Sequence, residues 1–210
     1  MSSQKYFHYY FSDSKYKDNF FVNQTNQKAF EFSNINNFDQ NIFLFGSKKS
    51  GKTHLLNLWK IKNNALSLDN NYYEVLNSKC NIAIDDALTN VDEEKLFHII
   101  NHCKLINVKV YITSSIDLNE FDFIFKDLLS RLRTFFYLSI NRPDDEMIKM
   151  YLTKLFIEKQ IIIKNKDIFE YIYNRVDRTY LDVFNFVEKI DKLSLEKKRQ
   201  LTIPLIREIL

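Results

Sequence analysis

Only two glycines occur in this chain of 210 residues, and they lie five positions apart, at Gly46 and Gly51. Glycine averages about 7% of ordinary chains, so their retention here indicates backbone conformations that other residues adopt with difficulty. Both belong to the run Gly46-Ser47-Lys48-Lys49-Ser50-Gly51-Lys52-Thr53. This spacing of glycine, lysine and threonine defines a phosphate-binding loop, or P-loop, and makes all eight residues candidates for contact with phosphates.

The segments beside the loop stand in the order that a P-loop needs. Apolar residues 42–45 predict a buried strand before the loop, and residues 53–59 predict a helix after it. In such a loop the backbone N–H groups surround phosphate oxygens, and the two glycines supply dihedral angles that a side chain would forbid. Lys52 is expected to reach the β- and γ-phosphates, and the Thr53 hydroxyl to ligate Mg²⁺. The flanking elements argue against a chance match in a lysine-rich chain.

Composition limits the classes of protein to which the chain can belong. Thirty basic and 27 acidic residues give a net charge of +3, and residues 143–210 hold 13 basic and 12 acidic residues. This balance argues against an extended DNA-binding surface. Two cysteines are too few for a disulfide framework, and neither a membrane-spanning run nor a signal peptide is visible. We therefore expect a protein of the reducing cytoplasm.

A pair of acidic residues is the second candidate part of the phosphate-binding site. Residues 82–84 predict a strand that ends in Asp85 and Asp86. Ligands of parallel sheets gather where the strands end, so this pair can reach a metal beside the P-loop. Asp85 is expected to hold Mg²⁺ through water, and Asp86 to orient or deprotonate the attacking water. An ordinary turn is the alternative, but the position 33 residues after Lys52 favours the metal role.

Small hydroxyl residues follow the next predicted strand, residues 108–112. Thr113 and its neighbours can hydrogen-bond the γ-phosphate or the attacking water, which makes Thr113 a candidate catalytic residue. Serine and threonine also begin loops in many proteins, so the structural alternative stays open.

Arg131 lies just before the last predicted strand, residues 135–140. An arginine in this position lies near the subunit edge and can act as an arginine finger on a neighbour's nucleotide. A basic surface turn is the alternative, and Arg133 is a rival for the same role.

The chain divides by pattern into three parts. Residues 1–19 predict an extended leader, residues 20–142 a P-loop nucleotide-binding domain, and residues 143–210 a small helical lid. The amphipathic helices expected in the lid cover about residues 145–159, 167–175, 179–193 and 203–210.

Several segments together carry a family resemblance. They are Gly51-Lys52-Thr53-His54-Leu55, the strand into Asp85-Asp86, Ile112-Thr113-Ser114, Ser130-Arg131-Leu132 and residues 201–210. In combination they resemble the AAA+ module of the bacterial replication initiator DnaA and, more closely, the family of its short regulatory homologue Hda. The resemblance covers nearly the whole chain. It implies an α/β, P-loop AAA+ three-layer sandwich with a five-stranded parallel sheet, followed by a small α-helical lid.

The resemblance also implies a function. Hda-like proteins bind adenine nucleotide, attach to the DNA-loaded sliding clamp by an N-terminal peptide, and promote hydrolysis of ATP held by DnaA. It therefore implies ATP or ADP with Mg²⁺ as cofactors, DnaA and the clamp as partners, and negative regulation of replication initiation. The finger falls on Arg131, the metal aspartate on Asp85 and the phosphate loop on Gly46 through Thr53. Sequence-specific DNA is not an expected partner, since DnaA continues into a DNA-reading domain where this chain ends. Membranes are not expected partners either. A homo-oligomer stays open.

The leader departs from the family pattern. The clamp-binding peptide begins with glutamine and has hydrophobic residues one, three and five places on. Here Gln4 is followed by Lys5, Phe7 and Tyr9, so two of the three anchors remain. A short extended peptide binds through a few anchors in pockets, and clamp docking through Gln4, Phe7 and Tyr9 is weighed against an unstructured leader.

Two other departures concern hydrolysis. The family's nucleotide-sensing lid arginine falls near Leu181, which cannot replace it. Arg178, one helical turn earlier, is the candidate nucleotide-binding residue that could substitute for it. Ser115 stands where DnaA often carries aspartate. Weak intrinsic hydrolysis is therefore expected. The alternative function is a self-contained ATPase of DnaA or helicase-loader type acting on DNA; a small-molecule kinase is disfavoured by the helical lid and the missing acceptor-site signature.

Overall fold

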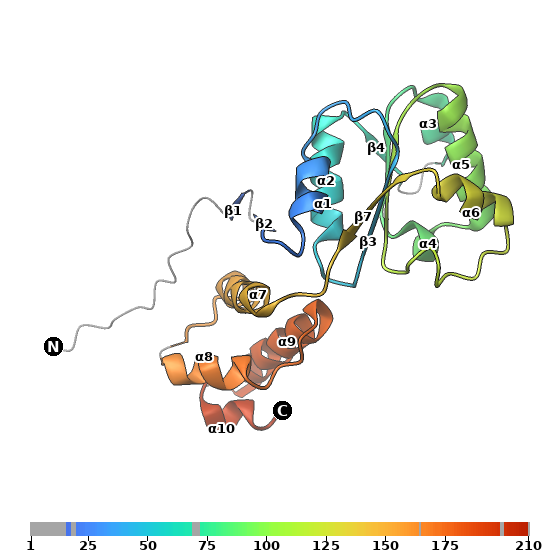
Figure 1. Ribbon diagram of the computed structural model, residues 1–210. Helices are drawn as coiled ribbons and strands as arrows, with labels where there is room; N and C mark the ends of the chain where they lie inside the picture. The colour runs from blue at the N-terminus through green and yellow to red at the C-terminus, as the bar shows by residue number, and fades with distance from the viewer. Residues whose placement is uncertain (1–15, 18–19, 69–71, 164, 198–199, 210) are drawn as a thin grey trace. The chain divides into compact units, whose positions relative to one another are not determined.

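The computed structural model describes residues 16–17, 20–68, 72–163, 165–197 and 200–209. The chain divides into two units, each with its own hydrophobic core (Figure 1). Residues 26–141 form the first, which we call the α/β unit. The second, the helical unit, consists of residues 142–209 together with the described residues up to Thr25.

The α/β unit is built on one sheet of five parallel strands. The strand that precedes the P-loop, β3, lies between β6 and β7, with Phe43 opposite Ile112 on one side and Tyr137 on the other. Buried residues fill the central strands, as expected when helices cover both faces of a parallel sheet. In spatial order the strands are β4 (Leu66–Ser67), β5 (Ile82–Ile84), β6 (Val110–Ser114), β3 (Ile42–Gly46) and β7 (Phe136–Ile140).

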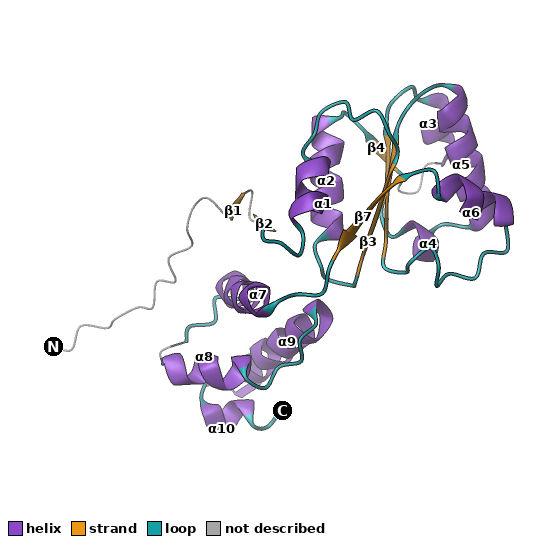
Figure 2. Cartoon of the chain, viewed as in Figure 1, coloured by secondary structure: helices purple, strands orange, loops and turns teal. Residues whose placement is uncertain are grey.

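Helices lie on both faces of this sheet, which gives three layers (Figure 2). On one side are α1 and α2, and on the other are α3, α4, α5 and α6 (Figure 1). Their bounds are α1 (Gln27–Ser33), α2 (Lys52–Lys62), α3 (Tyr72–Asn77), α4 (Ala87–Asn90), α5 (Glu93–Leu105) and α6 (Lys126–Leu132).

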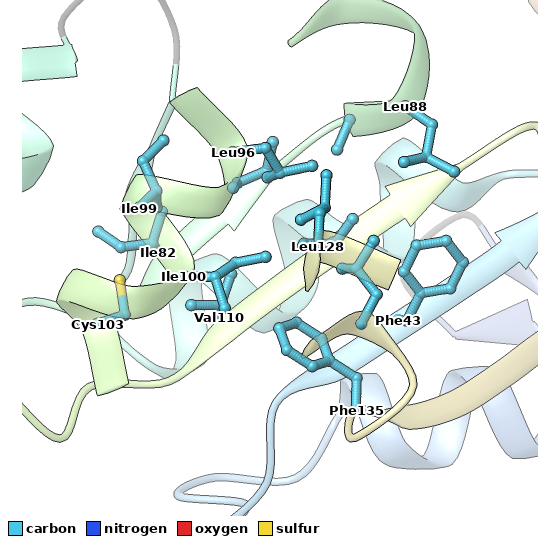
Figure 3. Packing of buried hydrophobic residues seen from close by; sticks show 14 of the residues in the cluster. Phe43, Ile82, Leu88, Leu96, Ile99, Ile100, Cys103, Val110, Leu128 and Phe135 are labelled. Carbon is cyan, nitrogen blue, oxygen red and sulfur yellow. The ribbon is translucent and has the colours of Figure 1, made fainter. Parts of the chain in front are cut away.

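Helix α5 shows how the sequence produces this packing. The Asp92 carboxylate accepts hydrogen bonds from two backbone N–H groups of the first turn and caps the helix. Leu96, Ile99 and Ile100 recur at helical spacing and are buried. Figure 3 shows these side chains meeting strand residues such as Val110.

The helical unit consists mainly of four helices. They bury a separate cluster of apolar side chains that includes Leu152, Ile172, Val183 and Ile206. The bounds are α7 (Asp145–Glu158), α8 (Lys166–Tyr173), α9 (Tyr180–Lys197) and α10 (Ile203–Ile206). Within the described ranges, no helix is long and apolar enough to span a bilayer.

The N-terminal segment differs in part from expectation. Most of the predicted leader, including Gln4, Phe7 and Tyr9, lies outside the described residues. Two short strands, β1 (Tyr16–Lys17) and β2 (Phe20–Phe21), pair antiparallel where the sequence pattern indicated no strand. The last helix, α10, is also shorter than the predicted helix over 203–210.

Candidate nucleotide-binding site

The predicted P-loop joins the end of β3 to the start of α2. Gly51 has φ 97° and ψ 13°, the left-handed region that side chains rarely adopt. Gly46 serves a different purpose, because Gly51 has the only positive φ among the glycines. A Cβ on Gly46 would lie 2.8 Å from Ser50 Oγ and 3.2 Å from Ile140 Cβ. The expectation that both glycines supply a forbidden dihedral angle is therefore wrong for Gly46, which supplies space.

Lys52 is held across the loop by backbone carbonyl groups. Its Nζ donates to Gly46 O at 2.8 Å and Ser47 O at 3.0 Å, and the residue is only 7% exposed. Burial lowers the pKa of the Lys52 ammonium, while the carboxylates of Asp86 and Asp85 oppose this shift. An ammonium has three donors, so the loop fixes the position of a cation that can still donate to an anion.

Asp85 connects the P-loop helix to the neighbouring strand. Its Oδ2 accepts from Thr53 Oγ1 at 2.7 Å, and its Oδ1 accepts from Thr113 Oγ1 at 2.6 Å. Hydroxyl and carboxylate oxygens are the ligands that Mg²⁺ prefers, and the ion keeps several waters. The adjacent oxygens of Thr53 and Asp85 therefore fit a magnesium ion, and these two residues would hold it.

Asp86 is anchored to Ser115. The Asp86 carboxylate accepts from the Ser115 backbone N–H at 2.6 Å and from Ser115 Oγ at 3.1 Å. The Asp86 N–H donates to Thr113 Oγ1 at 2.8 Å, and the residue has a left-handed φ of 47°. Both carboxylate oxygens are thus engaged. Sequence reasoning counted Ser115 among the small hydroxyl residues that could bond the γ-phosphate or the attacking water, and as a departure from the family, but did not pair it with Asp86. A hydroxyl at the end of the strand beside an acidic pair was the available signal.

A cavity of about 710 Å³ opens beside Thr53 and Asp85. Its wall includes polar side chains of α2 and α5, among them Asn57, Lys60 and Lys95. Sequence reasoning did not identify this space, because it forms between segments far apart in the chain. It gives the predicted metal residues a polar, accessible surrounding.

Arg131 lies at the other end of the strands. It is in the last turn of α6, which leads into the start of β7. Strands β3 and β7 are parallel, with Ile42 opposite Phe136 and Gly46 opposite Ile140. The P-loop follows the carboxyl end of β3, so about 16 Å of strand separates the two ends. The structure does not bring Arg131 to its own P-loop. Neither Arg131 nor the more exposed Arg133 forms an ion pair with a described residue.

The two lid positions lie in the helical unit. Leu181 is in the first turn of α9. Arg178 precedes that helix, with its Cζ 4.2 Å from the centre of the Tyr173 ring and its Nη1 3.8 Å from Asp145 Oδ1. Arg178 is therefore ordered by contacts inside the lid.

Two comparisons of the sequence with known proteins agree on replication initiation. The family model "Hda, lid domain" matches residues 158–210. The chromosomal replication initiator protein DnaA of Buchnera aphidicola subsp. Cinara cedri is 28% identical over 229 aligned residues, which cover 91% of this chain and 51% of that protein. The chain thus spans about half the length of this curated relative.

Solved structures confirm the predicted AAA+ fold. Domain III of DnaA from Thermotoga maritima matches with a TM-score of 0.71 at 16% identity, over 90% of this chain and 92% of that one. AMPPCP-bound DnaA from Aquifex aeolicus matches with a TM-score of 0.64 at 19% identity, over 88% and 68%. The RuvB Holliday junction branch migration motor of Thermotoga maritima matches with a TM-score of 0.62 at 15% identity, over 89% and 68%.

Proposed function

Because this chain is an Hda-like, DnaA-homologous AAA+ protein related to replication initiation, we propose that it switches initiation off by promoting hydrolysis of DnaA-bound ATP. It acts in trans, in the cytoplasm, together with the DNA-loaded sliding clamp. In this proposal its own P-loop holds ATP or ADP as a ligand that maintains its shape, and the decisive chemistry occurs in the P-loop of DnaA.

The placement of Arg131 is the observation that carries the proposal. An arginine finger must contact the phosphates on which it acts. Arg131 stands near the amino end of β7, while its own P-loop follows the carboxyl end of β3. An arginine side chain is shorter than the roughly 16 Å of strand between them. Only the nucleotide of another molecule can reach Arg131, and Arg131 has no carboxylate partner among the described residues that would compete.

The geometry of the P-loop supports nucleotide binding with slow turnover. Lys52 and the loop N–H groups bind phosphates, and Thr53 with Asp85 would hold Mg²⁺, which neutralises phosphate charge when bound. Asp86, the residue expected to activate water, is held by Ser115 through both carboxylate oxygens, and Leu181 stands where the family's nucleotide-sensing arginine is expected. This supports weak hydrolysis by the chain alone.

Clamp attachment is assigned to the leader. Gln4, Phe7 and Tyr9 supply a polar start and two aromatic anchors, which suit an extended peptide in a pocketed groove. This part of the proposal rests on the sequence pattern.

The test is a reconstituted assay of DnaA-bound ATP on clamp-loaded DNA. The native chain is compared with Arg131→Ala, with Arg133→Ala as the matched control, and with a chain lacking residues 1–11. An arginine finger contributes about 10³- to 10⁵-fold to hydrolysis. We expect Arg131→Ala to lower the stimulated rate by at least about 10³-fold, Arg133→Ala to retain it, and the deletion to remove the dependence on the clamp. Equal rates for all four proteins contradict the proposal.

The connected set Lys52, Thr53, Asp85 and Thr113 favours one competing function, a self-contained ATPase acting on DNA. The two functions differ in whose ATP is cleaved. Fast ATP turnover by the purified chain without DnaA supports the ATPase, whereas nucleotide binding with little turnover supports the regulator.

A further inference from the structure

Two large apolar side chains lie exposed, next to each other in the chain, at the start of α6. Ile124 is 84% exposed and Phe125 is 41% exposed. Single apolar side chains on a surface are normal, whereas contiguous ones can mark a contact site. Helix α6 lies beside α5 in the α/β unit and carries Arg131 in its last turn (Figure 1). We call Ile124 and Phe125 the α6 apolar pair.

The core on either side of the pair is already filled. Phe123, the residue before the pair, is 2% exposed, and its ring meets that of Phe121 edge to face at 4.7 Å. Leu128, in the first turn of α6, is fully buried. The chain thus buries its apolar side chains before and after the pair and leaves the pair itself in contact with solvent.

A carboxylate from α5 holds the backbone of the pair. Glu93 Oε1 accepts from the Ile124 N–H at 3.2 Å, and Glu93 Oε2 accepts from the Phe125 N–H at 3.0 Å. Hydrogen bonds to an ionised carboxylate are roughly twice as strong as those between neutral groups. A segment that is fixed before binding loses less conformational freedom when a partner covers it. The fold therefore presents the two side chains from a fixed backbone.

The pair lies close to the residue that is proposed to act on DnaA. Ile124 precedes Arg131 by seven residues, which is roughly 10 Å at the rise of an α-helix. Asp127 and Ser130 are exposed between them, so one continuous helix surface joins the pair to Arg131. A specific interface buries about 800 Å² on each partner, which corresponds to a disc of roughly 16 Å radius. A contact of this size around Arg131 includes the pair.

Acidic residues border the pair and indicate the chemistry of a matching surface. Residues 117–127 contain four carboxylates and one lysine. Glu120, Asp122 and Asp127 are exposed and form no ion pair with a described residue. Charges across a specific interface are complementary. The matching surface is therefore apolar where it meets Ile124 and Phe125, and basic around that centre.

We propose that the α6 apolar pair is a docking contact for DnaA, packing into an apolar site with a basic rim on the nucleotide-binding module of that protein. The inference rests on the proposed function, which brings the nucleotide of DnaA to Arg131. A few buried apolar or aromatic anchors carry much of the affinity of an interface. Contacts that are equally strong in the ground state and the transition state add affinity without raising the rate. The pair supplies affinity, and Arg131 supplies the rate.

The experiment separates these two quantities. The dissociation constant is measured by interferometry, with the full chain binding to immobilised full-length DnaA that holds a non-hydrolysable ATP analogue. The rate is that of DnaA-bound ATP hydrolysis on clamp-loaded DNA at saturating concentrations of the chain. Ile124→Ser with Phe125→Ser should weaken binding at least about 30-fold and keep the saturated rate within about twofold of the native value. Arg131→Ala should lose the rate and keep the affinity.

Two features of the variants guard against an effect of misfolding. Phe125 is the N-cap residue of α6 and makes no capping hydrogen bond, and serine is favoured at this position. The pair variant should therefore show the native thermal transition. Glu93→Ala keeps both side chains and releases their backbone, so it should weaken binding by a smaller factor, about 2- to 10-fold.

The matched control is Ile61→Ser with Ile35→Ser. These side chains are 75% and 39% exposed, and they belong to α2 and to the segment after α1, on the other side of the sheet (Figure 1). The control should bind DnaA like the native chain. Equal loss in the two double variants overturns the proposal, as does native affinity of the pair variant or failure of the native chain to bind DnaA. Self-association of the native chain that the pair variant abolishes, with DnaA binding unchanged, also overturns it and identifies a second copy as the partner.

Failure of the docking contact is distinguishable from failure of the proposed function. If the pair variant binds DnaA like the native chain while Arg131 still stimulates hydrolysis, the docking contact is wrong and the proposed function stands. If binding depends on the pair but DnaA-bound ATP is not hydrolysed faster, the docking contact stands and the proposed function is wrong.

Discussion

The α/β unit holds the cation of its candidate site in the interior, whereas two arginines of the helical unit lie on its surface. Lys52 is 7% exposed and lies between backbone carbonyl groups of its own loop. Arg175 and Arg207 are exposed and lie against the ring of Tyr171. The first arrangement fixes a cation by hydrogen bonds, and the second by contact with an aromatic face.

This difference indicates which kind of ligand each unit can bind. A buried charge loses its hydration and is favourable only when an anion of matching geometry reaches it. Such a site selects one small ligand. Exposed charges cost little to maintain, contribute little singly, and gain strength by acting together on a polymer with many phosphates. The buried cation of the α/β unit is therefore suited to one small anion such as a nucleotide, whereas the exposed arginines of the helical unit contribute little singly.

Replacing the buried cation tests the first half of this comparison and has the largest expected effect. Truncating one partner of a buried, hydrogen-bonded charge pair costs about 2–5 kcal/mol, so Lys52→Met should weaken ADP binding by at least about 30-fold. Unfolding stability without nucleotide should not fall, because the variant removes a desolvated ammonium. Titration calorimetry with ADP and urea unfolding measure the two quantities.

The matched control for Lys52→Met is Lys48→Met, which changes an exposed lysine of the same loop. Exposed ion pairs contribute about 0–1 kcal/mol, so its ADP affinity should stay within about fivefold of the native value. Equal loss in both variants would show that burial of Lys52 has no special role.

The backbone of the loop offers a second test of the same site, with a smaller expected effect. Gly51 has φ 97°, and a left-handed conformation costs a residue with a Cβ about 1–2 kcal/mol. Gly51→Ala should lower the free energy of unfolding of the α/β unit by about that amount. Gly51→Asn should lose less, since asparagine visits this region more readily. Urea unfolding followed by Trp59 fluorescence measures the stability of both variants. Equal free energies of unfolding of the native protein and the two variants would contradict backbone strain at Gly51.

The nucleotide site could be predicted largely because its parts are local or lie at strand ends. The loop from Gly46 to Thr53 is contiguous, so its motif contains the whole phosphate cradle. Asp85 follows β5 and Thr113 lies near the end of the neighbouring parallel strand β6, and their contact follows from the order of those strands. The five-stranded parallel sheet was expected from the resemblance to the AAA+ module, and the structure has it.

What the sequence did not reveal depends on register and on distant pairing. Ser115 reaches Asp86 only because β5 and β6 pair in a particular register. The strand predicted over residues 108–112 is observed at Val110–Ser114, because the side chain of Asn81 takes the Lys109 N–H while the far end continues to pair with β3.

The packing of α10 against α8 could be seen only in the folded chain for a similar reason. It brings Arg207 against Tyr171, 36 residues away.

One carboxylate of the helical unit is held by hydrogen bonds, as the buried cation of the α/β unit is. Replacing this carboxylate is the change with the smallest expected effect. Asp144 caps α7 through Met147 N–H at 2.8 Å and accepts from the amides of Asn23 and Gln24 at 3.0 and 3.1 Å. Partial burial works against its charged form, but these hydrogen bonds outweigh that effect and hold the pKa of Asp144 below its usual value.

The lowered pKa fixes the sign of a pH-dependent effect. The charge of Asp144 stabilises the fold fully above the unfolded pKa of about 3.9 and is lost as the pH falls through the lower folded pKa. Asp144→Asn keeps a capping oxygen and removes only the charge. It should cost about 0.5–1 kcal/mol at pH 7, where Asp144→Ala costs about 1–2 kcal/mol. Urea unfolding from pH 7 down to pH 2 should show the gap between the Asn variant and the native protein begin to narrow below about pH 4 and close as the pH falls through the lower folded pKa, below which both carry a neutral group. A stability gap that stays constant to pH 2 would show that the charge of Asp144 contributes nothing and that its cap alone matters.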